Sequence, residues 1–306
     1  MQEQVRQILS IYCLCDDFLR AWGHKDAPQA KMTTAQVMTV ALVAVTLFNG
    51  NQERSRCFLQ EHGYIPKMLS KGAFNRRLHE IPDAFWQALF GLLADVHKQL
   101  NKNQEYAVDS LPVPVCDNIR INRCRLYPCP KSDKKQKKQK KQDKATTRDK
   151  VAKDKAAKKG EGFRGYIASK RRYFYGLKVH LLVTTTGLPV EVMLTPGSEA
   201  DINAFKCLPL DLPEPAHIFA DAGYLDDHEQ ALLEKAAGLH LVAARRSNCK
   251  EQLLPWVSYI SKHERKRVET VFSQIVSAFG RTIHAVTARG FELKVFLTVL
   301  AYTLTA

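Results

Sequence analysis

Hydrophobic residues recur with helical spacing along the first hundred residues of the chain. Val5, Ile8 and Phe18 trace one face of a first helix. The apolar run Val37–Phe48 predicts a buried helix, because it is shorter than a bilayer requires and contains two threonines. Residues 1–104 are therefore expected to form an all-helical domain.

The stretch from Ser70 to Ile81 predicts a short helix within this domain. Phe74 and Leu78 face inward at an i, i+4 spacing, whereas four polar side chains point largely outward: Lys71, Asn75, Arg76 and Arg77. A short helix of this kind beside a core helix is typical of the recognition element of a helix-turn-helix. An ordinary solvated helix face fits the pattern equally well, so both interpretations stand.

From Tyr106 onward the spacing becomes that of strands alternating with helices. The expected strands are 106–115, ended by two prolines, then 173–184, 188–194, 217–221 and 239–246. Helices are expected at 198–208, 226–237, about 261–279 and 291–304. This order predicts an α/β domain over 105–306, with a mixed five-stranded sheet flanked by helices.

A lysine-rich tract at about 131–160 interrupts the predicted α/β domain. It holds fourteen Lys or Arg against four Asp, contains one Val and has no aromatic residue. Such a segment buries too little apolar area to offset its ordering entropy, so disorder is expected. Non-specific attraction to phosphate is the expected role, and a surface insertion without consequence is the alternative.

Composition and charge narrow the class of protein. The hydrophobic fraction of 45% indicates a globular core, and the net charge of +15 with a pI near 9.4 indicates a polyanionic partner. The lysine-rich tract accounts for about +10 of that charge, so the rest is modestly basic. Eight cysteines without a C-x-x-C pair, and an N-terminus without a leader, favour reduced thiols in a cytosolic protein.

Two expected strands carry a carboxylate where their apolar run ends. Asp109 lies in YAVDSLPV, and Asp221 follows the strand HIFA directly. A single strand-end Asp often only terminates a strand. If the two strands are neighbours, however, the carboxylates repel one another, and a divalent cation is the usual way to keep both ionised.

A third acid is available on the helix SKHERKRVETVFSQI. Val268, Phe272 and Ile275 form its apolar stripe, and Glu269 lies at the edge of that stripe. Arg265, four residues earlier on the same side, can pair with Glu269 or with phosphate. Such a Glu is more often an ordinary surface residue, and only the two preceding aspartates favour a role for it.

Together these motifs resemble bacterial insertion-sequence DDE transposases with an RNase H-like catalytic domain. The resemblance covers roughly residues 105–300 and rests on YAVDSLPVPV, RGYIASKRRYFYGLKVHLLVT, GLPVEVMLTPGSEAD, IFADAGYLDD and RKRVETVFSQI. Some groups of the family also have a Tyr three residues before the Arg and a Lys seven after the Glu. Lys262 and Val276 occupy those positions here, so membership of that subgroup is not supported.

The resemblance implies phosphoryl transfer by two Mg²⁺ or Mn²⁺ ions held by Asp109, Asp221 and Glu269, without a protein nucleophile or a small-molecule cofactor. Arg265 belongs to the implied catalytic set. Lys178 and His180 share a strand face and are expected to reach the scissile phosphate. Asp201 either caps the helix after Gly197 or supports the acids.

Double-stranded DNA is the expected partner, as the element's terminal inverted repeats and as target, with a homodimer joining the paired ends. The basic stretch RGYIASKRRYFYGLK contributes three candidate contacts with DNA, Lys170, Arg171 and Arg172. Its tyrosines either stack on displaced bases or pack along one face of a strand. The expected location is the bacterial cytoplasm, in association with the nucleoid, and no membrane contact is expected.

Three other functions compete with this interpretation. A tyrosine recombinase needs a constellation of Arg and His residues around its nucleophile, and no such constellation leads up to Tyr302. An RNase H-like structure-specific nuclease would use the same three acids but has no need of a helical domain that finds element ends. The third is a catalytically inactive DNA-binding protein derived from a transposase, against which the presence of all three acids argues.

Overall fold

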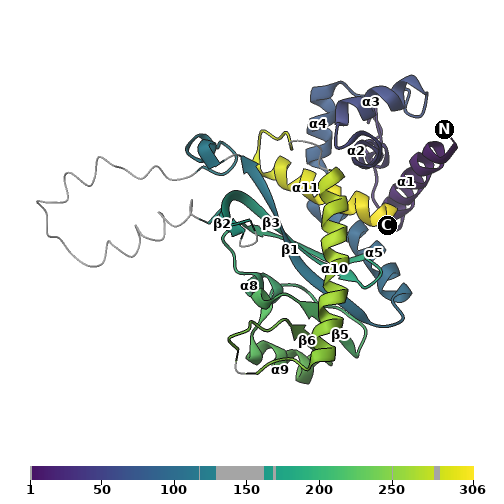
Figure 1. The fold of residues 1–306 in the computed structure, drawn as a ribbon. Coiled ribbons are helices and arrows are strands. Elements are labelled where there is room, and N and C mark those ends of the chain that lie inside the picture. The colour runs from purple at the N-terminus through teal and green to yellow at the C-terminus, as the bar shows by residue number, and fades with distance from the viewer. Residues whose placement is uncertain (1, 117, 129–161, 168–169, 250, 279–282) are drawn as a thin grey trace, which may run out of the picture.

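Five helices form the N-terminal part of the chain in the computed structural model, which describes residues 2–116, 118–128, 162–167, 170–249, 251–278 and 283–306 (Figure 1). They are α1 (Gln2–Ala21), α2 (Thr34–Phe48), α3 (Gln52–Glu61), α4 (Lys71–Glu80) and α5 (Asp83–Leu100). The lysine-rich tract lies outside the described residues, so its expected disorder and its role stay predictions.

Helix α2 is the core of the N-terminal part. It packs against α1, α3 and α4, and most of its residues are buried. Thr33 caps its first turn by accepting the N–H of Gln36, and Asn49 ends it in the left-handed region with φ of 49°. Helix α3 was not expected, because its sequence is mostly polar and buries only Ser55, Arg56 and Leu59.

A mixed sheet with α/β connections follows. Its strands are β1 (Glu105–Cys116), β2 (Arg164–Ile167), β3 (Arg172–Thr184), β4 (Pro189–Pro196), β5 (Ala216–Ala220) and β6 (Leu239–Ala243). Strand β3 pairs antiparallel with β1, β2 and β4, whereas β1, β5 and β6 are parallel neighbours. The fold class expected from the sequence, an RNase H-like sheet flanked by helices and preceded by a helical region, is confirmed.

The sheet differs from the expected one in two respects. It has six strands in the described residues rather than five, because the short strand β2 shares the outer edge of β3 with β4. A Cβ on Gly165 would clash with the carbonyl group of Gly197 and the ring of Phe174, so only glycine permits this pairing. Strand β1 also continues through Pro112 and Pro114, which lie beyond its pairing with β5 and face only β3.

Helices and short turns complete the α/β part. They are α8 (Asp201–Phe205), α9 (Asp227–Ala237), α10 (Pro255–Ala278), α11 (Ala288–Thr305) and the 3₁₀ turns η1 (Asn118–Arg123) and η2 (Ala222–Tyr224). Asp226 caps α9 by accepting two backbone N–H groups, and Gly238 ends it in the left-handed region. Helix α10 begins six residues earlier than the predicted Ser261.

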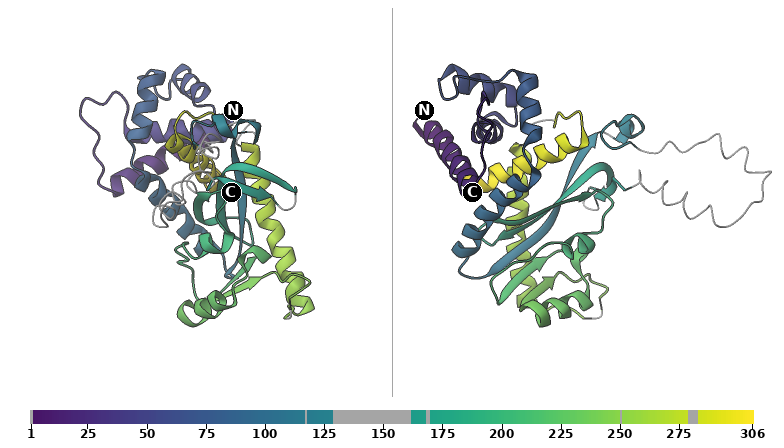
Figure 2. Two further views of the ribbon diagram at one scale, coloured as in Figure 1. Left: turned by 90° about the vertical axis from the view of Figure 1, so that its left-hand side faces the viewer. Right: turned by 180° about the vertical axis from the view of Figure 1, so that it is seen from behind.

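The two faces of the sheet are covered differently. Val268 and Phe272 of α10 lie in one hydrophobic cluster with Ala107 of β1 and Val179 of β3. The opposite face carries Val108 and Tyr106 and packs against α8 and η2. Figure 2 shows α10 along one side of the sheet in two further views.

The larger cluster is continuous beyond the sheet. It runs from α10 through α11 to α1, α2, α4 and α5, so the N-terminal helices and one sheet face share a core. The expected division of the chain between residues 104 and 105 therefore stays a prediction. No helix in the described part of the chain combines the length and apolar character needed to cross a membrane.

Candidate active site

The two strand-borne aspartates occupy equivalent places on neighbouring parallel strands. The ladder between β1 and β5 ends at the pair Val108 and Ala220, and Asp109 and Asp221 are the next residue on each strand. Side chains alternate along a strand, so Asp109 shares the face of Ala107, which packs against α10. An ion pair from α10 to Asp221 places the second aspartate on that face too.

Asp109 has an environment that disfavours its charged form. The pKa of this carboxyl is raised to about 6, mainly by burial and to a lesser extent by the nearby charges of Asp221 and Asp201. The backbone N–H of Ser110, which donates to Oδ1 at 2.7 Å, and the Arg265 guanidinium act in the opposite direction. A cation bound beside this carboxyl would favour its ionised form and so oppose the effect of burial.

Arg265 supplies positive charge at the site. Its Nη2 lies 3.1 Å from Oδ1 of Asp221, whose side chain is 52% exposed. The sequence suggested a partner in Glu269 or phosphate, and the structure pairs the guanidinium with Asp221 instead. The Arg265 Nε is buried without a hydrogen-bond partner among the described residues.

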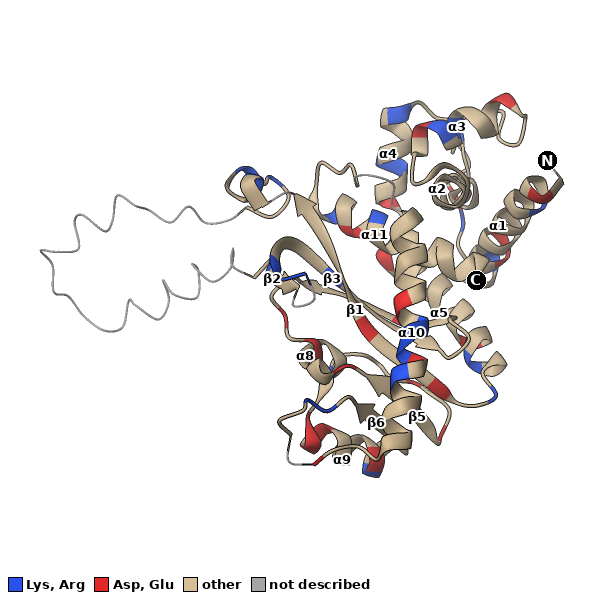
Figure 3. Cartoon of the chain, viewed as in Figure 1, with Lys and Arg blue, Asp and Glu red and all other residues tan. Residues whose placement is uncertain are grey.

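Glu269 lies one helical turn after Arg265 on α10. The residue is exposed, although the adjacent Val268 is completely buried. Its carboxylate forms no ion pair with any residue that the structure describes. Nor do three His, Cys, Asp or Glu side chains come together as a metal site anywhere in the described ranges. Figure 3 shows acidic and basic positions side by side on α10, which packs across β1.

Lys178 and His180 lie on the opposite face of the sheet from Asp109. The register pairs His180 of β3 with Ser110 of β1, and Ser110 lies on the sheet face opposite Asp109. His180, and with it Lys178 two residues earlier, therefore points away from α10. Lys178 forms an ion pair of 2.9 Å with Asp201, and His180 is fully buried. The expectation that these residues reach DNA is corrected for His180, because a ring with no exposed surface cannot contact a phosphate.

The polar residues of α4 divide into two groups. Lys71, Asn75 and Arg76 are exposed, as a contact with DNA requires. Arg77 is instead half-buried, and its guanidinium lies 2.8 Å from Asp26 and 3.5 Å from Glu80. Its position in the structure indicates that Arg77 fixes α4 to the loop before α2.

The hairpin of β2 and β3 carries an exposed basic and aromatic surface. Lys170, Arg171 and Arg172 are all exposed. The rings of Tyr166 and Tyr173, each 51% exposed, lie 4.9 Å apart. Tyr175 is buried and packs inside the protein, whereas Tyr166 and Tyr173 are accessible for stacking on bases. Each of the two interpretations of these tyrosines, packing and stacking, therefore describes part of the set.

Two residues near the aspartates were not assigned a definite role from the sequence. Asp201 does not cap α8, since the N-cap is Ala200, and its side chain bonds Lys178. Tyr224, three residues after Asp221, is fully buried against Phe205. For Asp201 the sequence offered only a single Asp at the start of an expected helix. For Tyr224 it offered no signal, because an aromatic residue after a strand is common.

Fold and site together define the class of protein: an RNase H-like α/β protein with paired aspartates at the ends of neighbouring parallel strands. The chain belongs to the transposase DDE domain family, whose model matches residues 100–304. It is also similar to a putative transposase for insertion sequence element IS6501 from Brucella ovis, with 30% identity over 98 residues, 32% of this chain and 74% of that protein. No solved structure matches the chain.

Proposed function

We propose that this protein cuts DNA at the two ends of an insertion element and joins the freed 3′-hydroxyl ends to target DNA by in-line phosphoryl transfer. The observation that carries the proposal is the placement of Asp109 and Asp221 at the end of one parallel ladder, on the sheet face that packs against α10. Glu269 on α10 supplies the third acid.

Asp109, Asp221 and Glu269 would hold two Mg²⁺ or Mn²⁺ ions. The chemistry of the donors fits, because all three offer carboxylate oxygens, the ligands that these hard cations prefer. The environment of Asp109 fits as well. Its pKa is raised to about 6, mainly by burial, and a bound cation would stabilise the ionised form of this carboxyl. When bound, such ions polarise the phosphate and lower the pKa of the attacking water or hydroxyl.

Arg265 is proposed to act on both the acid and the DNA. Its bond to Asp221 holds that carboxylate toward α10. A guanidinium released from the carboxylate presents a planar fork of donors that matches a phosphate. The Arg265 side chain is 20% exposed, so part of it is accessible to a phosphate.

Double-stranded DNA would lie across several basic surfaces. Lys71, Asn75 and Arg76 on α4 are proposed to contact the terminal repeats, and the β2–β3 hairpin to contact DNA beside the cleavage site through Lys170, Arg171 and Arg172. Their exposure supports these assignments. Each phosphate contact makes the slope of log affinity against log salt more negative by about 0.9. A homodimer acting on chromosomal DNA in the bacterial cytoplasm, each copy holding one end, completes the proposal.

The test is cleavage of labelled linear DNA that carries the element's presumed ends, in Mg²⁺, Mn²⁺ or EDTA. We expect products with a free 3′-hydroxyl in either metal and none in EDTA. Binding without cleavage in any metal would favour the inactive DNA-binding alternative. Cleavage that follows branched or frayed structure, whatever the end sequence, would favour a structure-specific nuclease.

A further inference from the structure

The spacing of the two aspartates is not fixed by the sheet itself. The last paired residues of β1 and β5 are Val108 and Ala220, one position before Asp109 and Asp221. After Asp221 the chain turns into η2, so the contacts of η2 act together with the Arg265 ion pair to position Asp221 relative to Asp109. The contacts of η2 described below come from the sheet face opposite α10.

An ion pair on that opposite face lies directly against η2. Lys178 Nζ is 2.9 Å from Oδ1 of Asp201 and also donates to the backbone oxygen of Glu199 at 2.8 Å. The pair is mostly buried, with side chains 14% and 26% exposed. It fixes the start of α8 to the middle of β3.

Asp201 in turn packs against the backbone of η2. A Cβ added to Gly223 would lie 3.2 Å from Asp201 Oδ2, closer than an ordinary van der Waals contact. The absence of a side chain at Gly223 therefore lets the carboxylate approach the turn. Asp201 is also close enough to raise the pKa of Asp109.

Tyr224 makes a second connection between η2 and the neighbouring strands. Its ring meets that of Phe205 on α8 edge-on, with centroids 5.8 Å apart. Its hydroxyl lies 3.5 Å from Nδ1 of His180, whose Nε2 is 2.8 Å from the hydroxyl of Thr195. Since burial lowers the pKa of His180 to about 4, this ring is neutral at physiological pH.

We propose that Lys178 and Asp201 are positioning residues of the metal site: their ion pair holds η2 in place and so sets the distance between Asp109 and Asp221. The inference rests on the proposed function, since it assigns a role toward the same ions. Residues that orient metal ligands without touching the metal affect its affinity about 10- to 100-fold.

Electrostatics alone would give a different result from positioning. Lys178→Met leaves the Asp201 charge unopposed, which by itself would strengthen binding of a cation at the aspartates. Asp201→Asn removes a negative charge, which would weaken it. A positioning role predicts that both variants weaken binding, because either one releases η2.

The experiment measures Mn²⁺ affinity of the full chain by electron paramagnetic resonance, without DNA. We expect Lys178→Met and Asp201→Asn each to raise the Mn²⁺ dissociation constant about tenfold or more. Gly223→Ala changes no charge and no ion pair, yet its Cβ would push η2 from Asp201, so a similar loss is expected. Circular dichroism verifies that each variant is folded at the temperature used.

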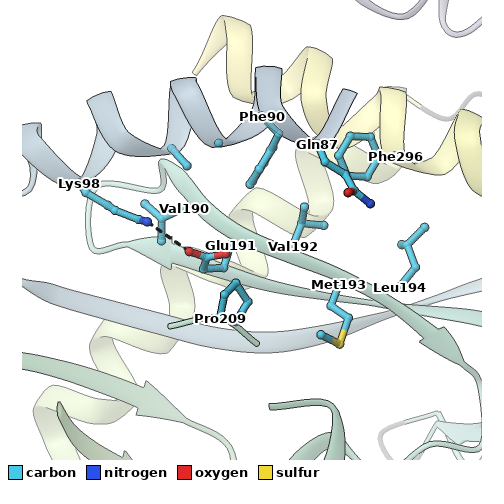
Figure 4. A pocket seen from close by; sticks show the side chains of 12 residues that line it. Gln87, Phe90, Lys98, Val190, Glu191, Val192, Met193, Leu194, Pro209 and Phe296 are labelled. Carbon is cyan, nitrogen blue, oxygen red and sulfur yellow. Dashed lines mark ion pairs between the residues drawn. The ribbon is translucent and has the colours of Figure 1, made fainter. Parts of the chain in front are cut away.

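A second ion pair in the protein serves as the matched control. Lys98 of α5 and Glu191 of β4 are 3.2 Å apart with side chains 11% and 12% exposed, and they lie in a pocket of about 510 Å³ that no candidate site residue lines (Figure 4). Lys98→Met is expected to lower stability but to leave Mn²⁺ affinity within about twofold, because it does not touch η2.

The outcomes separate the inference from the proposed function. Opposite shifts in Lys178→Met and Asp201→Asn, unchanged affinity in both, or an equal loss in Lys98→Met would overturn the positioning role while the metal site stands. A wild-type protein that binds no Mn²⁺ would overturn the proposed function, and this inference with it.

Discussion

Glu269→Gln is expected to reduce DNA cleavage at least about 1,000-fold, which is about 4 kcal/mol of transition-state stabilisation, and to change DNA affinity less than about threefold. The substitution keeps the shape of the side chain but removes the negative charge that a metal ligand needs. Because Glu269 is exposed and packs against nothing essential, folding should not change. Rates from end-labelled DNA and affinities from fluorescence anisotropy measure the two effects.

The matched control for this prediction is Glu264→Gln. Glu264 lies five residues earlier on the same helix, and its Oε1 is 3.1 Å from Nδ1 of His263. Cleavage by this variant is expected to stay within about threefold of wild type, because the residue holds no ion in the proposal. If instead Glu264→Gln were the inactive variant, the third acid would have to be reassigned to Glu264.

Asp109→Asn is expected to stabilise the metal-free protein at pH 8 while abolishing cleavage. The folded state raises the pKa of Asp109 from 3.8 to about 6, so it favours the protonated carboxyl. This stabilising contribution is complete below about pH 4 and is lost as the pH rises through about 6. At pH 8 the buried, ionised carboxylate lowers the free energy of unfolding. The neutral amide of the variant carries no charge and avoids this loss.

The shift of about two pKa units corresponds to a gain of at most about 3 kcal/mol in the free energy of unfolding of the variant. Each kcal/mol raises the melting temperature by about 2–4 °C. Thermal denaturation in EDTA measures it at pH 8 and at pH 5, where the advantage of the variant should shrink. Asp227→Asn, at an aspartate with a 73% exposed side chain, is the control and should show no comparable gain. A variant that melts below wild type at pH 8 would contradict the account of Asp109.

Asp109 and Asp221 stood out in the sequence because each brings a carboxylate to an apolar strand. The alternation of strands and helices predicted a mixed α/β sheet, and the order of its strands came from the structure. What the sequence lacked was the register, since a shift of one residue along β3 exchanges the two faces of that strand. Lys178 and His180 were correctly placed together, but the pairing of His180 with Ser110 turns both away from Asp109.

Long-range pairs explain the other differences. The sequence did not reveal the ion pair of Arg77, because its partner, Asp26, is 51 residues earlier in an irregular segment. Arg265 was expected near Glu269 by helical spacing, yet its ion pair is with Asp221 on a different element. Strand β2 escaped notice because four residues with a central glycine show no strand periodicity, and only the close approach of Gly197 gives it a place.

The measurement that tests the central claim most directly is the metal preference of Asp221→Cys. The claim is that Asp221 binds the metal that cleavage needs. A thiolate ligand accepts Mn²⁺ much better than Mg²⁺, so replacing the carboxylate by a thiol should alter metal choice rather than only the rate. Both proteins are assayed on the same labelled DNA, and the ratio of rates in Mn²⁺ and Mg²⁺ is compared.

We expect cleavage by Asp221→Cys to be at least about 1,000-fold slower than wild type in Mg²⁺. In Mn²⁺ the variant should recover at least about tenfold of that loss, after division by the ratio of the wild-type rates in Mn²⁺ and Mg²⁺. Wild-type cleavage by the variant in Mg²⁺, or an equal loss in both metals, would contradict the claim that Asp221 is a metal ligand.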